Sequence, residues 1–515
     1  MQKINQTTLL LQSKNTHNIT KQTAMKSTKH FLLIVFSLMI LSCDDFLDLE
    51  PISEEISANG YDTASQIEAA LVGSYESFQS AEYYVWDNIL FSDVRSDNAY
   101  AGGDNPEIFA IDKLELTPTN SRLFRNWSNL YNAIAKANLV IDRIGLVDDP
   151  ALTSERRDQI RGEAKFLRAY HYFTLVKLWG GVPLVTAYST SALPSEVNIP
   201  RSSVEEVYNQ IITDLEEAAS LLPDTYGSDN NINKARATAG AANALLAKVY
   251  AQKPNPDYAK VVEKIELVEN STANYTLIGY ANLFNGNNYN NAESIIEVQY
   301  LGGNEGNYGP QLLLPPSISG DTWRKFVTPS KNLISAFDEQ GDVVRKNASI
   351  LNETVQWVDE YWGNAVGSSI PFSYKWKVAG GFNSSNRQYL LRLGDIILLK
   401  AEALNELNQL ELATVEVNRI RNRANLPNLT PSQRSSKEVL RTTILKERRL
   451  ELFQEGHRWD DLVRNNAALS TMQNLVEIDL RTGNPVNYNM TPAKILLPIP
   501  QQELDRNPAL TQNPL

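Results

Sequence analysis

Paired amphipathic helices constrain this chain more than any other feature of its sequence. Apolar side chains recur at steps of three and four over residues 390–407, and the spacing returns over 412–423 after a short break. This spacing predicts two helices, and so short a connection predicts that they pack antiparallel as a hairpin. Further pairs are expected over 121–179 and 202–251, and another helix is expected to begin near Ser436.

A single helical hairpin cannot bury both of its faces, so several must stack to give a continuous core. Residues 233–251 are rich in alanine, and small side chains let helix axes approach closely. We therefore predict a mainly α fold with a tetratricopeptide-like helical-hairpin scaffold, built from 61–253 and 386–470. Short β-like runs and Asn/Gly loops fill the region between, mainly 254–385, which we expect to form a loop-rich, minor-β cap.

The first part of the chain has the pattern of a secretory signal. Residues 31–41 are uncharged and almost wholly apolar, and they follow Lys26 and Lys29. A membrane-spanning helix needs ~20 such residues, so this run suits the core of a signal peptide. The run ends in the order apolar, apolar, small, Cys that is typical of a bacterial lipobox, with Cys43 as its cysteine.

We therefore expect cleavage before Cys43 and acylation of its sulfur, although a buried free cysteine beside an ordinary signal peptide is the alternative. Residues 1–42 are then the signal peptide, with Met25 as the expected true start. Residues 43–60 form the lipidated N-terminus and an acidic tether, and 61–515 form one domain.

Charge and cysteine content exclude several classes of function. The formal net charge of the whole chain is −12, and the segment before Cys43 holds lysines and no acids, so the remainder is more acidic still. Such a chain is a poor candidate for nucleic acid or an anionic membrane surface. An acylated Cys43 leaves no thiol for disulfides, catalysis or metal. Only His171 and His457 remain after the signal, so no metal and no cofactor is predicted.

A series of short stretches, in order over nearly the whole chain after position 43, supports a more specific interpretation. They are residues 44–48 (DDFLD), 161–170 (RGEAKFLRAY), 178–183 (LWGGVP), 234–242 (KARATAGAA), 392–398 (RLGDIIL), 446–452 (KERRLEL), 456–460 (GHRWD), 497–500 (LPIP) and 507–508 (NP). The set resembles the SusD/RagB family. One small departure is the C-terminus, where members often end Gln-Asn-Pro-Gly-Tyr and this chain ends at 512–515 with QNPL.

The resemblance implies a SusD-like nutrient-binding lipoprotein of Bacteroidetes, anchored in the outer membrane and facing the cell exterior. It implies a glycan or oligosaccharide ligand, sometimes a peptide, delivered to a SusC-like TonB-dependent transporter on which the protein sits as a lid. The family it resembles is not catalytic.

Two charged helical patterns are interpreted as structure. Arg157, Arg161, Lys165 and Arg168 line one ridge of a helix, and Glu447, Glu451 and Glu455 recur at four-residue steps between arginines. Salt bridges between such groups are the favoured interpretation, with those glutamates as suitable partners for the basic ridge. Glu447 and Glu451 could also be imagined as an acid/base pair, but carboxylates flanked by arginines on one helix are expected to stay ionised.

The better ligand-binding candidates are aromatic residues outside the helical scaffold. A sugar ring presents an apolar C–H face and a rim of hydroxyls, which suit a flat aromatic ring beside amides and carboxylates. In the family, loops at two places contribute to the ligand site, whereas Trp357, Tyr361, Trp362 and Trp376 could equally be the core of the cap. The candidates are Tyr83, Tyr84, Trp86, Asp93, Asp97 and Asn98 in the first loop, and Tyr308, Trp323 and Arg324 in the second.

The sequence thus favours a glycan-binding surface lipoprotein without catalytic activity. A peptide receptor would instead show a groove with backbone-pairing edges or charged pockets. A surface glycoside hydrolase would place two carboxylates in the aromatic pocket, ~5 Å apart or ~6.5–9.5 Å apart according to mechanism. A purely structural subunit of a transporter complex would bind no ligand alone.

Overall fold

A computed structural model describes residues 61–80, 86–191 and 193–515 of the chain. The chain divides into two units at Asp62 and Thr63, and the second unit, Thr63–Leu515, is described here by itself. The predicted signal peptide, Met25, the tether and the lipidation site Cys43 all lie outside the described residues. Within the part of the chain that is described, no helix combines the length and apolarity needed to cross a membrane.

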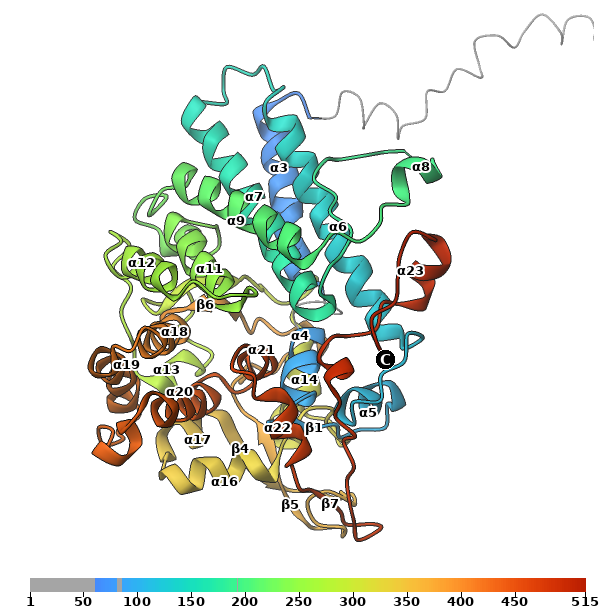
Figure 1. Ribbon diagram of the computed structural model, residues 1–515, viewed down its shortest axis with the longest axis vertical. Helices are drawn as coiled ribbons and strands as arrows, with labels where there is room; N and C mark the ends of the chain where they lie inside the picture. The colour runs from blue at the N-terminus through green and yellow to red at the C-terminus, as the bar shows by residue number, and fades with distance from the viewer. Residues whose placement is uncertain (1–60, 81–85, 192) are drawn as a thin grey trace, which may run out of the picture. The chain divides into compact units, whose positions relative to one another are not determined.

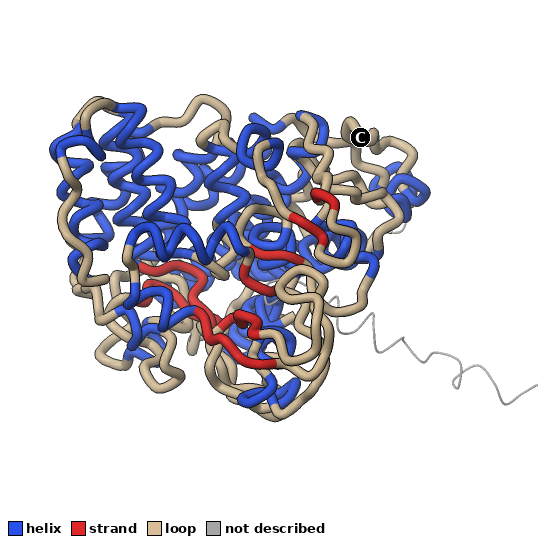
Figure 2. The backbone as a smooth tube through the Cα atoms, turned by 90° about the horizontal axis from the view of Figure 1, so that it is seen from below, coloured by secondary structure: helices blue, strands red, loops and turns tan. Residues whose placement is uncertain are grey.

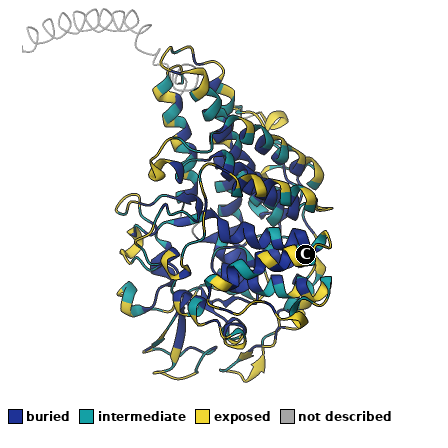
Figure 3. Ribbon diagram, turned by 90° about the vertical axis from the view of Figure 1, so that its left-hand side faces the viewer, coloured by how far each residue is buried: buried dark blue, intermediate teal, exposed yellow. Residues whose placement is uncertain are grey.

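The N-terminal half of this unit is an array of helices in which each helix packs on the next (Figure 1). Helix α3 packs on α6 and α7, α7 packs on α9, α9 on α11, and α11 on α12. Their inner faces are buried and their outer faces are exposed, as Figure 3 shows. The bounds are α3 (Ala64–Tyr75), α6 (Ser121–Ile144), α7 (Ser154–Trp179), α9 (Val204–Leu221), α11 (Ala239–Gln252) and α12 (Tyr258–Glu269).

The array continues through the C-terminal helices, although a long insertion separates the two halves in sequence. Helix α12 packs on α18 (Leu393–Glu406), which in turn packs on α19 (Leu410–Arg423) and α20 (Lys437–Leu452). The predicted mainly α fold of stacked helical hairpins is therefore confirmed. Helix α12 falls within the range predicted to be mainly cap, but it packs between two scaffold helices.

Local sequence explains where these helices begin and how closely they pack. Helix α9 starts with a capping box, in which Ser203 and Glu206 each accept the other's backbone N–H. Helix α11 is the inner helix, and its alanines from Ala241 to Ala251 are buried. A Cβ at Gly240 in this helix would lie 2.6 Å from the Tyr275 hydroxyl, so the close approach requires glycine.

In the described residues, the strands form four two-stranded antiparallel pairs beside the helical array (Figure 2). The pair β2–β6 precedes α18 directly, so residues 390–392, expected to be helical, extend a strand instead. Ile296 faces Leu391 in its register, and this pairing overrides the helical spacing. The pairs are β1 (Ala99–Tyr100) with β3 (Thr328–Pro329), β2 (Ser294–Val298) with β6 (Gln388–Arg392), β4 (Ile350–Thr354) with β5 (Ser369–Ser373), and β7 (Ile478–Asp479) with β8 (Asn484–Pro485).

Shorter helices fill the remaining segments. The segment from Trp86 to Asn98, predicted to belong to a loop, contains α4 and η3 and is followed by α5, and most of the described positions from 86 to 101 are buried. These helices are η1 (Glu76–Gln79), α4 (Asp87–Ile89), η3 (Leu90–Val94), α5 (Pro106–Asp112), α8 (Pro194–Val197), α10 (Asn230–Asn233), α13 (Tyr280–Leu283), α14 (Gly309–Leu313), α15 (Pro316–Ser319), α16 (Lys331–Gln340), α17 (Val343–Ser349), η4 (Gly381–Asn383), η5 (Pro431–Arg434), α21 (Arg458–Arg464), α22 (Ala468–Gln473), η6 (Pro492–Ile495) and α23 (Gln501–Arg506).

A buried ion-pair cluster, which we call the Glu451 junction, ties the cap to the scaffold. Glu451 of α20 pairs with Arg392 of β6 at 2.7 Å, with Arg345 of α17 at 3.3 Å, and with Arg423 of α19. Burial alone would raise the pKa of Glu451, but Arg423, Arg392 and Arg345 hold it well below its ordinary value. The four side chains come from four different elements, so the cluster fixes how these elements meet.

The basic ridge of α7 is structural, as predicted, but its predicted partners were wrong. Arg168 pairs with Asp214 of α9 at 2.7 Å, and Arg157 donates to the backbone carbonyls of Ile144 and Val147. The glutamates of α20 meet arginines from the cap and from α19 instead. Spacing along one helix shows which side chains share a face, but it does not show which distant helix covers that face.

Candidate ligand-binding cleft

An open cleft of about 1100 Å³ lies in the described part of the chain. Ligand pockets are typically ~300–1,000 Å³, so this cleft has room for several sugar rings. Its walls come from four separate regions: residues 100–113, 312–326, 357–382 and 477–488. Its aromatic lining consists of Tyr100, Phe109, Trp323, Phe326, Trp357, Tyr361, Phe382 and Tyr488.

The short β1–β3 pair brings two of these walls together. Ala99 faces Pro329 and Tyr100 faces Thr328, so the segments on either side of the pair must run close to each other. A Cβ at Gly102 would lie 2.0 Å from the carbonyl oxygen of Lys325. Only glycine allows this backbone approach, which sets residues 101–104 against the loop that holds Trp323.

Two aromatic side chains present open faces or edges to the cleft. Trp323 is partly exposed, and its ring has the Lys325 ammonium on one side, 4.1 Å from the ring centroid. Phe382 is 53 % exposed and stacks on Tyr308, with ring centroids 6.3 Å apart and an interplanar angle of 30°. Large exposed aromatic rings at the rim of a cavity are suited to contact an apolar ligand face.

The second predicted loop therefore lies at the cleft. Trp323 and Arg324 line it, and Tyr308 reaches it through its stacking on Phe382. The Arg324 guanidinium is exposed and pairs with Glu360 across the cleft wall at 3.4 Å.

The described candidates of the first predicted loop, Trp86, Asp93, Asp97 and Asn98, are buried and do not line the cleft. Trp86 is 1 % exposed and packs edge-on against Phe326 and Tyr308, so it supports rings that reach the cleft. Tyr83 and Tyr84 lie outside the described residues.

The polar candidates of the first loop hold it to the C-terminal helices. Asp93 accepts hydrogen bonds from the Asn98 side chain at 2.9 Å and from the Gln454 backbone N–H at 3.1 Å. Asn98 accepts from the Arg449 guanidinium at 2.8 Å, and Asp97 forms two hydrogen bonds with Arg458, both 2.8 Å. Their hydrogen-bonding capacity is largely used inside the protein, which leaves little of it for a ligand.

Acidic and phenolic side chains form one end of the cleft, which we call the acidic end. The Tyr361 hydroxyl donates to Glu477 at 2.5 Å, and the Tyr488 hydroxyl donates to its other oxygen. The Tyr100 hydroxyl donates to Asp359 at 2.6 Å, and the Tyr100 ring stacks on Tyr361 with centroids 4.0 Å apart. Burial raises the pKa of Glu477, although both phenols oppose the shift.

Asp112, at the end of α5, is a third carboxyl at the acidic end, and it is partly buried. One of its oxygens accepts the Ala101 backbone N–H at 3.0 Å, and the other is buried with no hydrogen-bond partner in the described residues. Burial raises the pKa of Asp112 to about 8, and the nearby Glu477 adds to the shift, while the Ala101 N–H opposes it.

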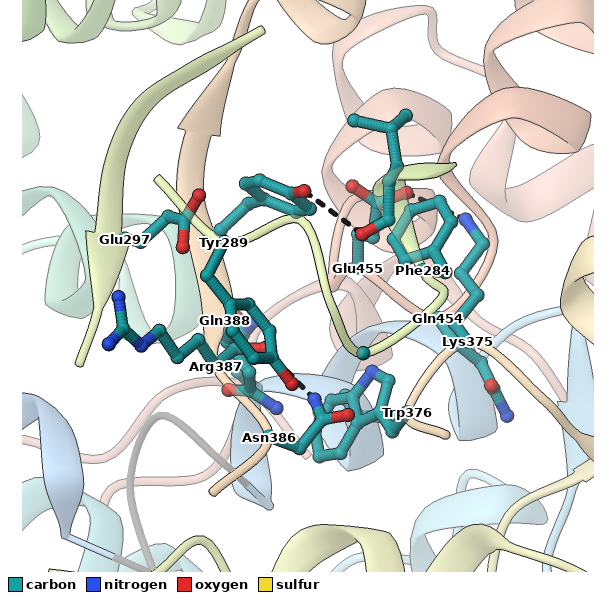
Figure 4. A pocket seen from close by; sticks show the side chains of 15 residues that line it. Phe284, Tyr289, Glu297, Lys375, Trp376, Asn386, Arg387, Gln388, Gln454 and Glu455 are labelled. Atoms are coloured by element: carbon teal, nitrogen blue, oxygen red, sulfur yellow. Dashed lines mark hydrogen bonds and ion pairs between the residues drawn. The ribbon is translucent and has the colours of Figure 1, made fainter. Parts of the chain in front are cut away.

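A smaller pocket lies at the meeting of the cap and the scaffold and is shown in Figure 4. Phe284, Trp376, Gln388 and Gln454 are among its lining residues, and Lys375 pairs there with a neighbouring glutamate. Its volume is about 30 Å³. One water needs ~10–15 Å³, so this pocket has room for water but not for a sugar ring.

Several lining residues were not identified from the sequence. Phe382 stands alone in a Gly-Gly-Phe-Asn turn, and an isolated aromatic residue directly after two glycines was the available signal. Asp112, Glu477 and Tyr488 share no motif, because they come from segments more than 360 positions apart in the sequence. Trp357 and Tyr361, considered as possible core of the cap, line the cleft. Among the described residues, no group of His, Cys, Asp and Glu side chains is placed to hold a metal ion.

These features define a class of protein: a scaffold of stacked helical hairpins that carries an open, aromatic-lined cleft built from loops. Two family models match the chain. One, described as starch-binding and associating with the outer membrane, matches residues 45–251, and one for the SusD family matches residues 317–515. The chain belongs to the SusD/RagB family.

Individual relatives agree with this assignment over nearly their whole length. SusD-like protein P38 of Formosa agariphila is 28 % identical over 522 residues, covering 93 % of this chain and 97 % of that one. A SusD-like protein of Bacteroides ovatus is 26 % identical over 477 residues, covering 85 % and 82 %.

Solved structures share the fold. A laminarin-binding SusD-like protein superposes with a TM-score of 0.71 at 27 % identity, covering 88 % of this chain and all of that chain. Surface glycan-binding protein A of Bacteroides fluxus has the same TM-score at 24 % identity, covering 88 % and 99 %, and shows likeness of fold.

Proposed function

We propose that this protein binds a glycan or oligosaccharide in the cleft and releases it unchanged. The observation that carries the proposal is a cleft of about 1100 Å³ in which the partly exposed Trp323 and the exposed Phe382 lie near carboxyl and phenol groups. Flat rings bury the C–H faces of sugars at little cost in side-chain entropy, and the polar groups can bond the hydroxyls. The laminarin-binding relative supports a carbohydrate ligand.

We further propose that the protein is lipidated at Cys43, faces the cell exterior from the outer membrane, and delivers its ligand to a SusC-like TonB-dependent transporter. The sequence around Cys43 and the family's association with the outer membrane support this proposal. Mass spectrometry of the protein from its native membrane should find an acylated N-terminal Cys43. Affinity purification through this chain should recover a TonB-dependent transporter, and an unmodified thiol at position 43 would contradict the anchor.

Binding without catalysis is favoured by the state of the scaffold glutamates. Glu447 pairs with Arg345 at 2.5 Å and with Arg421 at 2.9 Å, and Glu451 is surrounded by three arginines. Both carboxylates are held in ion pairs inside the protein, and neither lines the cleft. The carboxyls at the acidic end mean that hydrolase activity must also be tested, because Asp112 has the raised pKa that is typical of a general acid. Release of reducing sugar by the purified protein would show that it is a hydrolase.

The test of binding is a combined glycan and peptide array probed with the purified protein, followed by titration of the best ligand. Trp323→Ala is expected to weaken binding by about tenfold or more, as removal of a central aromatic contact does. Tyr188→Ala is the matched control, because Tyr188 is a partly exposed aromatic residue that does not line the cleft. An unchanged affinity in Trp323→Ala would place the ligand elsewhere. A peptide as the best ligand would support the peptide-receptor alternative.

A further inference from the structure

A fully buried lysine lies directly behind the Trp323 ring. The Lys325 side chain has no exposed surface, and its ammonium lies over the indole, 4.1 Å from the ring centroid. Trp323 itself is partly exposed and lines the cleft, whereas Lys325 does not line it. Because the ammonium is buried, the ring face that it covers is turned to the protein interior. A ligand can therefore contact Trp323 only on the remaining surface of its ring.

The same ammonium ties together the loop that carries Trp323. It donates to both oxygens of Asp321 at 2.6 Å and 2.7 Å, to the Gln311 carbonyl at 2.9 Å, and to the Ser319 hydroxyl at 3.1 Å. The side-chain amide of Gln311 donates to the Asp321 carboxylate as well, at 2.7 Å. One buried charge thus links four positions of the segment 311–325, which contains Trp323.

Close packing holds the base of this loop. A Cβ at Gly103 would lie 2.6 Å from the Phe326 ring, so the backbone of residues 102–103 fits tightly against the loop. The Phe326 ring in turn contacts Trp323, with ring centroids 5.8 Å apart. The indole therefore packs on two groups, an ammonium and a phenyl ring, that the rest of the fold holds in place.

Stability alone does not require a charged side chain at this position. Burial lowers the pKa of Lys325, and the hydrogen bonds and charge of Asp321 oppose the shift. Replacement of a buried ion pair by apolar side chains of similar volume is often neutral or stabilising. The lysine does define one geometry, because its hydrogen bonds and its contact with the indole must be satisfied together.

We propose that Lys325 is a positioning residue for ligand binding, which holds the Trp323 indole in its binding orientation before a glycan arrives. A preformed aromatic surface binds more tightly, because the glycan does not have to order it. Lys325 acts through Trp323 and makes no contact with the ligand. This role rests on the proposed function, because it concerns the aromatic contact that the same cleft offers to a glycan.

The first measurement needs no glycan. The protein is labelled with 5-fluorotryptophan for fluorine NMR, and the Trp323 resonance is assigned by its loss in Trp323→Phe. Lys325→Met, which removes the charge from a side chain of similar length, is expected to split or broaden this resonance. Lys264→Met is the matched control, because Lys264 is buried, pairs with Glu216 at 2.9 Å and does not line the cleft. A single narrow Trp323 resonance in Lys325→Met would overturn the proposal.

The second measurement tests whether Lys325 acts through Trp323. The affinity for the glycan selected by the array is titrated in the parent, in Lys325→Met, in Trp323→Ala and in the variant with both changes. Lys325→Met is expected to lower the affinity about threefold to tenfold, which is the cost of ordering one side chain on binding. The same change should have no further effect where Trp323 is already alanine. Equal losses in the two backgrounds would overturn the proposal, and Lys264→Met should keep the parent affinity.

A paired variant separates positioning from folding. Lys325→Met alone leaves the Asp321 carboxylate without its cation, which lowers stability. Asp321→Asn combined with Lys325→Met removes both charges, and it should fold and show the same loss of affinity as Lys325→Met. Full affinity in this folded variant would overturn the proposal.

The affinities also separate this role from the proposed function. If Trp323→Ala weakens binding and Lys325→Met does not, only the positioning role is removed. If Trp323→Ala leaves the affinity unchanged, or if no member of the array binds, the proposed ligand site is removed and the positioning role with it.

Discussion

Two clusters of buried acids in this protein behave in opposite ways. In the Glu451 junction, the carboxylate lies between Arg392, Arg423 and Arg345, which hold its pKa well below the ordinary value. At the acidic end of the cleft, Asp112 is partly buried and has no ion-pair partner among the described residues, and desolvation raises its pKa to about 8. Burial is common to both clusters, so the partners decide the sign of the shift.

This difference in partners distinguishes buried acids that hold the fold together from buried acids that are candidates for binding a ligand. A buried charge whose partners all lie within the protein fixes the relative positions of its elements, as the Glu451 junction does for the cap and the scaffold. A buried acid without such a partner destabilises the folded chain when it ionises, unless a ligand supplies the partner. Because the unpaired acids border the large cleft, we interpret them as part of its ligand site.

Removing the charge at the centre of the Glu451 junction should have the largest effect on the free energy of unfolding. Glu451→Gln leaves three buried arginines with fewer partners, and breaking such a cluster costs ~3–5 kcal/mol. Urea unfolding should show this loss, while Glu438→Gln on the same helix should change the free energy of unfolding by less than ~0.5 kcal/mol. A loss below ~1 kcal/mol in Glu451→Gln would contradict the structural role of the junction.

The next largest effect should be the contribution of Asp112 to the pH dependence of stability. The folded protein keeps the Asp112 proton up to about pH 8, whereas the unfolded chain releases it near the ordinary value of 3.8. Between these values the folded state binds more protons, so its stability falls as the pH rises, by up to ~1.4 kcal/mol per pH unit from this group. Unfolding measured from pH 5 to pH 8 should show a smaller decline in Asp112→Asn. Parallel curves for the two proteins would show that Asp112 is not protonated in the folded state.

Glu451 should make the free energy of unfolding change with pH in the opposite direction. Its pKa is lowered from 4.5 in the folded state, so its contribution to stability is complete above that pH and is lost in acid. The two carboxyls thus predict two separate pH ranges in which stability changes: a loss of stability in acid that depends on Glu451, and a loss toward neutral pH that depends on Asp112. Glu451→Gln should remove the first and Asp112→Asn the second.

Phe382 should affect binding more than stability. Its ring is 53 % exposed, so Phe382→Ala removes a ligand contact and little core. We expect the affinity for the array-selected glycan to fall about threefold to tenfold, since an aromatic contact contributes ~0.5–1.5 kcal/mol beyond its area. The free energy of unfolding should stay within ~0.5 kcal/mol of the parent value. A larger loss of stability than of affinity would indicate that the ring supports the loop and does not contact ligand.

The exposed ion pair on the cleft wall should have the smallest effect on stability. Arg324 and Glu360 lie 3.4 Å apart with both side chains substantially exposed. Exposed pairs contribute ~0–1 kcal/mol, so Arg324→Gln should change stability by less than ~0.5 kcal/mol at physiological salt. A change above ~1 kcal/mol would show that charge pairing on this wall resembles the Glu451 junction.

The sequence predicted the scaffold because helical spacing is a local property. The apolar spacing over 390–407 and 412–423 predicted the αα-hairpin correctly. The prediction was wrong only for residues 390–392, which belong to strand β6. The salt-bridge role of Glu451 was also predictable, because arginines flank it. Its actual partners were not, because Arg345 comes from the cap and Arg392 from strand β6, both far from α20 in sequence.

The site was predictable only where an aromatic residue stands in a loop that remains a loop. Trp323 and Arg324 line the cleft, as the resemblance implied for that region. Trp86, Asp93 and Asn98 lie in a segment that becomes helical and buried, because Arg449 and the Gln454 backbone satisfy its polar groups. That pairing depends on contacts across more than 350 positions, which no local pattern shows.

The most direct test of this account is a crystal structure of the protein with the glycan selected by the array. We predict a sugar ring against the indole of Trp323 and polar contacts toward the acidic end of the cleft. A glycan bound at any other surface, with the cleft filled only by solvent, would contradict the assignment of this cleft as the ligand site.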